Sequence, residues 1–322
     1  LGRLTYRSTN ELDIIINKIL TYENNPPLAD SGWFTRASLC GDPSSSGIGV
    51  VYVNQWVKTQ LLAQGYTQVD TIWGGNFASL MTQNANQGLS VFGYRGWLGM
   101  SGMTSSGIQA LSNGGELPFA VVVTCGTGSF KSETTAISEA WTKAANGGGI
   151  GAVGTATLGT HTRYNNTYYK GCWDGAINGS DHRLGVAHTR GKLELYRAYQ
   201  LAEPSRVEIW SVWNNLMGEP AVDMYTGLPA TLTVSYPATL PPGANAVPIS
   251  VRSGGQPVAD ARVTIYRSGA VRETAYSDTA GQVVLPLPTD LSAGTLLVTV
   301  TGHNLIAHLG SLSIASLPAF AT

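Results

Sequence analysis

The chain has 322 residues, long enough to form two domains of ordinary size. Its net charge is −1 and 12% of its residues are charged, so it lacks the basic field that binds nucleic acid or an acidic membrane surface. No apolar run approaches the roughly 20 residues that cross a bilayer, and we expect no membrane span. The 39 glycines, eight tryptophans and 14 tyrosines, with few lysines, favour an exported protein.

The first part of the chain, residues 1–226, alternates apolar runs with amphipathic segments. In chain order these predict helix 8–27, strand 36–42, helix 50–65, strand 68–74, helix 77–88, strand 89–96, helix 103–115, strand 119–126, helix 136–148, strand 149–157 and helix 186–202. Near-continuous apolar strands separated by helices indicate an α/β domain with a parallel sheet and helices on both faces. Ligands and chemistry on such sheets gather beyond the carboxyl ends of the strands.

The second part, residues 228–322, changes to a period of two. Seven short alternating segments are separated by Gly, Pro, Asp and Ser, at 230–237, 247–255, 261–269, 272–278, 281–288, 295–304 and 310–315. This pattern predicts an all-β immunoglobulin-like sandwich, with the domain boundary near the Gly-Leu-Pro at 227–229. Its simplest role is a rigid spacer or adhesion module, and its edge strands offer a route to self-association.

One cysteine stands at the end of a predicted strand. The stretch VVVTCGTGSF, residues 121–130, runs straight into Cys125 and then turns over Gly126, Thr127 and Gly128. Cys125 is either a nucleophile presented at the sheet edge or a small buried hydrophobic residue. Together with Cys40 and Cys172 it is too widely spaced for a disulfide framework or a metal clip, so we expect no metal site built on cysteine.

Several stretches, in the right order, carry a resemblance to a known family. They are residues 1–23, LGRLTYRSTNELDIIINKILTYE; 113–130, ending in LPFAVVVTCGTGSF; 147–157, GGGIGAVGTAT; 212–226, VWNNLMGEPAVDMYT; and 296–314, LLVTVTGHNLIAHLGSLSI. The chain resembles the gingipain-type cysteine peptidases, with the C-terminal part of a caspase-like catalytic domain followed by an immunoglobulin-like domain.

The resemblance implies a bacterial, secreted or cell-surface cysteine endopeptidase acting on peptide or protein substrates. It gives Cys125 the place of the nucleophile and the amides of Gly126, Thr127 and Gly128 the place of oxyanion donors. It implies no cofactor, and a structural calcium ion is a feature of the family for which no Asp/Asn loop here has the signature. Trp97, Tyr94 and Arg163 are candidate substrate-binding residues.

The chain departs from the family pattern at the catalytic base. The turn where the family places its His reads FGYRGWLGMSG, and Trp97 occupies the His position. In one interpretation His161, which follows the next strand, has become the base for Cys125. In the other, the fold is a pseudo-peptidase in which Trp97 fills the old cleft and the surface serves adhesion or assembly. Arg95, two residues before Trp97, is a candidate partner for a carboxylate.

Overall fold

The computed structural model describes residues 1–315 and divides the chain into two compact units. The first unit runs from Leu1 to Leu228, and the second begins at Pro229. The final residues of the predicted sandwich, 316–322, lie outside the described part of the chain.

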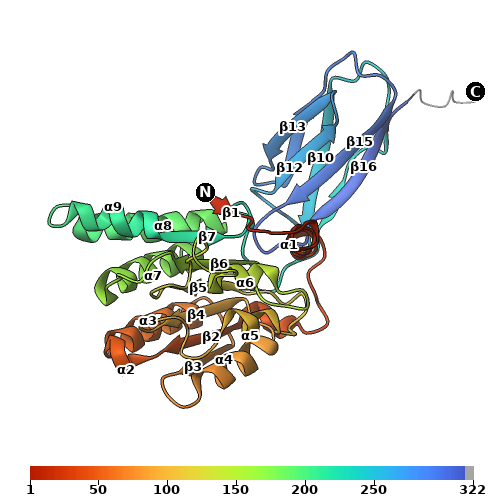
Figure 1. Ribbon diagram of the computed structural model, residues 1–322. Helices are drawn as coiled ribbons and strands as arrows, with labels where there is room; N and C mark the ends of the chain where they lie inside the picture. Colours follow the sequence, from red (N-terminus) through yellow and green to blue (C-terminus); the bar gives the residue numbers. More distant parts are fainter. Residues whose placement is uncertain (316–322) are drawn as a thin grey trace, which may run out of the picture. The chain divides into compact units, whose positions relative to one another are not determined.

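The first unit is built on a sheet whose order is β1-β7-β6-β5-β4-β2-β3 (Figure 1). Its strands are β1 (Gly2–Arg3), β2 (Arg36–Gly41), β3 (Gln68–Ile72), β4 (Val91–Arg95), β5 (Phe119–Val122), β6 (Gly151–Thr155) and β7 (Asn214–Met217). Strands β3, β2, β4, β5 and β6 are mutually parallel, as predicted, but β7 runs antiparallel to β6. The predicted parallel sheet is thus confirmed for its five central strands but does not extend to β7, because the strand-helix alternation stops after β6, where three successive helices precede β7.

Helices lie on both faces of this sheet (Figure 1). They are α1 (Thr9–Asn24), α2 (Pro43–Ser46), α3 (Gly49–Ala63), α4 (Phe77–Asn86), α5 (Ser105–Gln109), α6 (Ile137–Lys143), α7 (Thr162–Ile177), α8 (Leu184–Tyr199) and α9 (Pro204–Trp213), with a 3-10 helix, η1 (Ser31–Thr35). The sequence pattern missed α7 and α9. Helix α7 was not predicted because its buried face carries aromatic, small and polar side chains, which do not give the aliphatic periodicity of a typical amphipathic helix.

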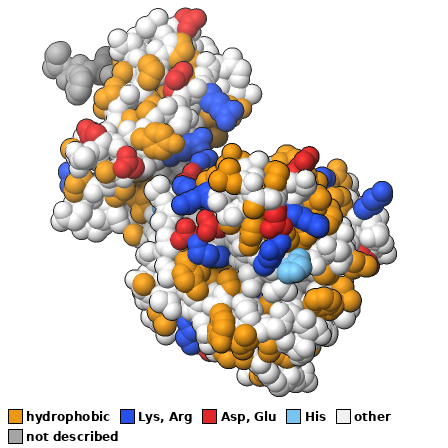
Figure 2. Space-filling model, turned by 90° about the vertical axis from the view of Figure 1, so that its left-hand side faces the viewer, with side chains coloured by type: hydrophobic (Ala, Val, Ile, Leu, Met, Phe, Trp, Pro, Cys, Tyr) orange, Lys and Arg blue, Asp and Glu red, His pale blue; other side chains and the backbone are white. Residues whose placement is uncertain are grey.

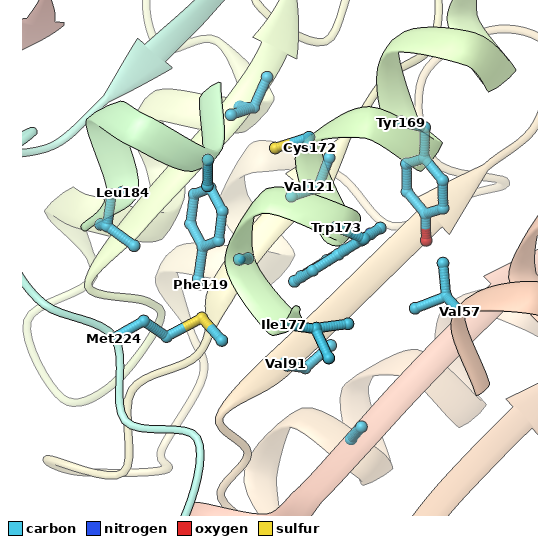
Figure 3. Packing of buried hydrophobic residues seen from close by; sticks show 14 of the residues in the cluster. Val57, Val91, Phe119, Val121, Tyr169, Cys172, Trp173, Ile177, Leu184 and Met224 are labelled. Carbon is cyan, nitrogen blue, oxygen red and sulfur yellow. The ribbon is translucent and has the colours of Figure 1, made fainter. Parts of the chain in front are cut away.

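Alternate residues of each central strand enter two separate cores. On β5, Phe119 and Val121 belong to the cluster under α3, α7, α8 and α9, whereas Ala120 and Val122 belong to the cluster under α4, α5 and α6. Figure 3 shows the first cluster, where Trp173 of α7 packs beside Phe119, with ring centroids 5.7 Å apart. Burial of both strand faces explains why these segments read as continuous apolar runs.

The second unit consists of strands in the described residues, and each of the seven predicted segments contains one. One sheet has the order β11-β10-β14 with β8 beside β10, and the other has the order β13-β12-β15-β16-β9. The strands are β8 (Thr233–Ser235), β9 (Thr239–Leu240), β10 (Ala246–Ser253), β11 (Gln256–Pro257), β12 (Arg262–Arg267), β13 (Val271–Tyr276), β14 (Gln282–Pro286), β15 (Gly294–Thr301) and β16 (His308–Ile314). Alternate residues such as Val247, Ile249 and Val251 form its buried core.

The surface carries charges of both signs. On the face that Figure 2 presents, basic and acidic side chains are interspersed among apolar ones, in keeping with a net charge of −1. Within residues 1–315, the helices are all too short or too polar to cross a membrane.

Buried His188 on α8 predicts a loss of stability in mild acid. Burial lowers its pKa to about 3, helped by the charge of Lys192. Below pH 6.5, the ordinary pKa of histidine, His188 is protonated in the unfolded chain but stays neutral in the folded chain. The contribution of neutral His188 to the free energy of unfolding is therefore complete above pH 6.5 and declines toward pH 3. We expect a loss of roughly 1–2 kcal/mol between pH 7.5 and pH 5. Urea unfolding of the wild type and His188→Gln at both pH values measures it, and equal losses in the two proteins would contradict the assignment.

Candidate active site around Cys125

Cys125 lies just beyond the carboxyl end of a central strand. Strand β5 is flanked by β4 and β6, both parallel to it. Three residues after β5, Cys125 forms an isolated parallel β-bridge with Leu98, and the Gly99 N–H donates to the Cys125 carbonyl at 3.1 Å. Trp97 is therefore the immediate neighbour of the residue that pairs with Cys125.

The sulfur is more enclosed than the sequence suggested. Cys125 is only 6% exposed, so the residue is buried although it lies at the edge of the sheet. Trp97 is 55% exposed and Leu98 is 58% exposed, so both present much of their surface to solvent rather than filling a buried cleft. The thiol Sγ lies 2.9 Å from Oγ1 of Thr160.

The amides predicted as oxyanion donors have other acceptors. The N–H groups of Gly126 and Gly128 donate to the carbonyls of Thr157 and Thr155 at 2.7 and 2.9 Å, and the N–H of Thr127 lies 3.4 Å from the carbonyl of Thr124. These bonds fasten the turn to the end of β6, where it packs closely.

Glycine makes this packing feasible. A Cβ on Gly128 would approach the backbone of Gly154 to 2.6 Å. In this conformation the turn after Cys125 stabilises the fold and leaves no amide of Gly126 or Gly128 free for an oxyanion.

His161 is the N-cap of α7 rather than a loop residue. Its Nδ1 accepts a hydrogen bond from the Arg163 N–H at 3.3 Å, so the hydrogen of the neutral ring is carried on Nε2. No hydrogen bond between His161 and Cys125 occurs in the described residues; the side chain that contacts the sulfur belongs to Thr160, one residue earlier. The parallel neighbour β6 does bring this segment to Cys125, but it presents a hydroxyl instead of an imidazole.

Of two candidate substrate-binding residues, one is buried and the other is engaged in an ion pair. Tyr94 is fully buried, its hydroxyl pairs with Ser101 Oγ at 2.7 Å, and burial raises its pKa. A side chain facing that core cannot contact substrate, because alternation turns it toward the α4–α6 side. Arg163 is exposed but committed to Glu203, with an ion pair at 2.7 Å, and lies over the ring of Tyr164.

Arg95 has no carboxylate partner. Its side chain is fully buried at the end of β4, and Nε donates to Asn166 Oδ1 at 2.8 Å. Among residues 1–315 no carboxylate lies within ion-pairing distance, and both terminal guanidinium nitrogens lack a hydrogen-bond partner. Burial lowers the pKa of Arg95 to about 10, against attraction to Tyr169, Tyr94 and Cys125, so it is a cation at neutral pH. The expected ion pair is therefore wrong.

A hydrogen-bond chain that sequence reasoning missed ends at the sulfur. Trp210 Nε1 of α9 donates to Asn165 Oδ1 at 2.8 Å, and Asn165 Nδ2 donates to Thr160 Oγ1 at 2.9 Å. The only signal in the sequence was the pair of amides in RYNN, residues 163–166, which become the first turn of α7. Their meaning depends on knowing that this segment is helical.

The described residues do not supply a metal site of the usual kind. They contain no group of three or more His, Cys, Asp or Glu side chains that could hold a metal ion. The calcium ion suggested by the family resemblance therefore has no such cluster in residues 1–315.

Comparison with known proteins places the chain in a family. The model of peptidase family C25 matches residues 1–225, which is the whole α/β part of the chain apart from its last residues. The chain belongs to peptidase family C25. Gingipain R2 of Porphyromonas gingivalis is 23% identical over 346 residues, which cover 98% of this chain and 44% of gingipain R2. Gingipain R1 of the same species is 24% identical over 335 residues, covering 94% of this chain and 31% of gingipain R1.

Solved structures of family C25 proteins share the fold. The crystal structure of the Arg-specific cysteine proteinase gingipain R superimposes with a TM-score of 0.85 at 19% identity, covering 98% of this chain and 74% of that chain. The complex of the pro- and mature domains of a Porphyromonas gingivalis gingipain gives a TM-score of 0.84 at 18% identity, covering 98% and 76%. The chain spans less than half the length of the curated relatives named above.

Proposed function

We propose that this chain is a cysteine-peptidase domain of family C25 that binds polypeptide over Cys125 and hydrolyses it far more slowly than an enzyme with a complete Cys–His pair. The observation that supports the proposal is the bridge between Leu98 and Cys125, which brings the segment of Trp97, the residue at the family's His position by resemblance, alongside the segment of Cys125. The thiol keeps its place while the base is replaced.

The chemistry explains why the missing imidazole matters. The Cys125 thiolate would attack a peptide carbonyl, the C–N bond would break with release of an amine, and water would hydrolyse the resulting thioester to regenerate the thiol. The leaving amine needs a proton and the attacking water needs a base, and an imidazole normally performs both transfers. Neither exposed Trp97 nor His161, whose Nδ1 caps a helix, performs them in this arrangement.

A non-catalytic role is the second candidate. The 6% exposure of Cys125 and the engaged amides of Gly126 and Gly128 favour a pseudo-peptidase that serves adhesion, assembly or another cell-surface function. In either case we propose a secreted or cell-surface location in a bacterium, supported by the composition and by the family resemblance. An immunoglobulin-like second unit acting as a spacer, and self-association through an edge strand such as β13, belong to the same proposal.

A peptidyl chloromethyl ketone tests the first candidate against the second. We expect mass spectrometry to find the label on Cys125 of the wild type and not on Cys125→Ala, together with slow cleavage of a fluorogenic peptide mixture that Cys125→Ala abolishes. A Cys125 that stays unlabelled, under conditions that label a control cysteine peptidase, would favour the non-catalytic role.

His161→Ala separates the two interpretations of the base. Because its Nδ1 is engaged with the Arg163 N–H, we expect the variant to be labelled at nearly the wild-type rate. A strong decrease in labelling, with the helix content unchanged by circular dichroism, would instead identify His161 as the base for Cys125.

A further inference from the structure

Arg95 and Cys125 lie on the same face of the sheet, on neighbouring strands. Val91 of β4 and Val121 and Val123 of the β5 segment point into the core shared with α7, and alternation turns Arg95 and Cys125 to the same side. Side-chain contacts agree. Arg95 Nε bonds to Asn166 at 2.8 Å, and the Cys125 sulfur contacts Thr160, which Asn165 holds.

The direction of the hydrogen-bond chain is set at its far end. The Trp210 indole can only donate, so Asn165 must turn its oxygen to Trp210 and its NH2 group to Thr160. Thr160 Oγ1 therefore accepts from Asn165, and the hydroxyl hydrogen remains available for the Cys125 sulfur, 2.9 Å from Oγ1. The chain can thus present a hydrogen-bond donor to the sulfur.

Arg95 supplies a cation that lacks an anion. A buried, uncompensated charge is costly, and its terminal nitrogens have no partner in the described residues. Tyr169, Tyr94 and Cys125 lie near enough to interact electrostatically with the guanidinium. Burial raises the pKa of both tyrosines, so they stay neutral, and Cys125 is the remaining neighbour whose side chain can carry a negative charge.

We propose that Cys125 is held as a thiolate without an imidazole, by the buried guanidinium of Arg95 and by the hydroxyl of Thr160 oriented through Asn165 and Trp210. Arg95, Thr160, Asn165 and Trp210 are positioning residues that favour the charged sulfur. Thr160 also stands at the start of α7, whose N-terminal end favours negative charge. The inference rests on the proposed function in treating Cys125 as the reactive thiol.

Stabilisation of the thiolate by Arg95 and Thr160 explains how the chain can retain Cys125 while lacking the catalytic base of the family. A fixed cation and a fixed donor stabilise the thiolate but cannot shuttle a proton to a leaving amine. The site therefore forms covalent adducts with electrophiles readily while amide hydrolysis stays slow. Reactivity toward a small alkylating agent is the property that this device controls.

Iodoacetamide alkylation of Cys125, followed by intact-protein mass spectrometry from pH 5.5 to 9, tests the inference on the full chain. Thr160→Val removes the hydroxyl with little change of shape and should lower the alkylation rate at pH 6.5 about tenfold or more, moving the pH profile to higher pH. Thr160→Ser, which keeps the donor, should restore the wild-type profile. Cys125→Ser measures the background from Cys40 and Cys172, both fully buried.

Other titratable groups near the site could also affect the pH profile of alkylation, and variants of them serve as controls. They are Tyr94 and Tyr169 beside Arg95, Asp42 through Ser101, and His161 next to Thr160. His161→Ala and Asp42→Asn should leave the profile in place. Trp210→Phe, which removes the indole N–H, is the second relay variant and should shift the profile in the same direction as Thr160→Val.

The outcomes separate this inference from the proposed function. Wild-type and Thr160→Val profiles that coincide would overturn the inference, as would a wild-type Cys125 that resists iodoacetamide at every pH. If Thr160→Val fails to fold, Trp210→Phe decides in its place. A shifted profile in a protein that never cleaves peptide would sustain the inference and defeat the peptidase proposal.

Discussion

Replacing Trp97 by His should raise the rate of peptide hydrolysis about 10²–10⁴-fold, the usual contribution of a positioned general acid–base. Residue 97 adjoins the Leu98–Cys125 bridge, so the substitution puts an imidazole on the segment that pairs with Cys125 without any change in the sheet. Trp97 is 55% exposed, so removing its indole opens no large cavity in a core. Initial rates of cleavage of a fluorogenic peptide mixture, at enzyme concentrations set by active-site titration, measure the gain.

Two variants control this result. Trp97→Phe keeps an aromatic ring but offers no base, and we expect it to cleave no faster than the wild type. The double variant Trp97→His with Cys125→Ala should lose the gained activity completely. A Trp97→His protein that is labelled at Cys125 yet hydrolyses at the wild-type rate would mean that the turn cannot direct an imidazole to the sulfur, and would favour the non-catalytic role.

Lys18→Met should lower the free energy of unfolding by roughly 3–5 kcal/mol. The Lys18 ammonium nitrogen of α1 lies 2.9, 3.1, 3.2 and 2.7 Å from the carbonyl oxygens of Trp141, Thr142, Ala144 and Gly147, around the end of α6, and its three N–H groups are shared among these four acceptors. Methionine keeps the apolar stem, so the variant isolates the loss of the donor and of the charge that faces the negative end of a helix. Urea unfolding followed by tryptophan fluorescence measures the change.

The matched control for Lys18→Met is Lys131→Met, because Lys131 is exposed. We expect it to change the free energy of unfolding by less than about 0.5 kcal/mol. Equal urea midpoints for the two variants would contradict the prediction. They would mean that water replaces the Lys18 ammonium at the four carbonyls without loss of stability.

The sequence predicted those parts of the fold that depend on the local pattern of apolar residues. Apolar runs buried on both faces predicted strands β2 to β6, and the turn after β5 put Cys125 at the carboxyl edge of the sheet. Period-two alternation located the strands of the second unit. The parallel order of the central strands followed from the alternation of strand and helix, and failed at β7, where that alternation ends.

The details of the site depend on contacts between segments that are distant in the sequence, and local patterns do not predict such contacts. Whether Arg95 has a counter-ion, and which side chain reaches the Cys125 sulfur, depends on α7, whose buried face shows no aliphatic periodicity. The role of Thr160 depends on Trp210, 50 residues further along the chain and one helix beyond α8. No local sequence pattern predicts such a hydrogen-bond chain.

The close apposition of Gly128 and Gly154 has a consequence for how new specificities could arise on this scaffold. Any side chain at either glycine would collide with the opposite main chain, so these two positions behind Cys125 tolerate almost no substitution. Trp97, Leu98 and Leu158, by contrast, project into solvent around Cys125 and bear little of the packing. Selection can therefore remodel the ligand preferences of this domain through those three positions while its architecture stays the same.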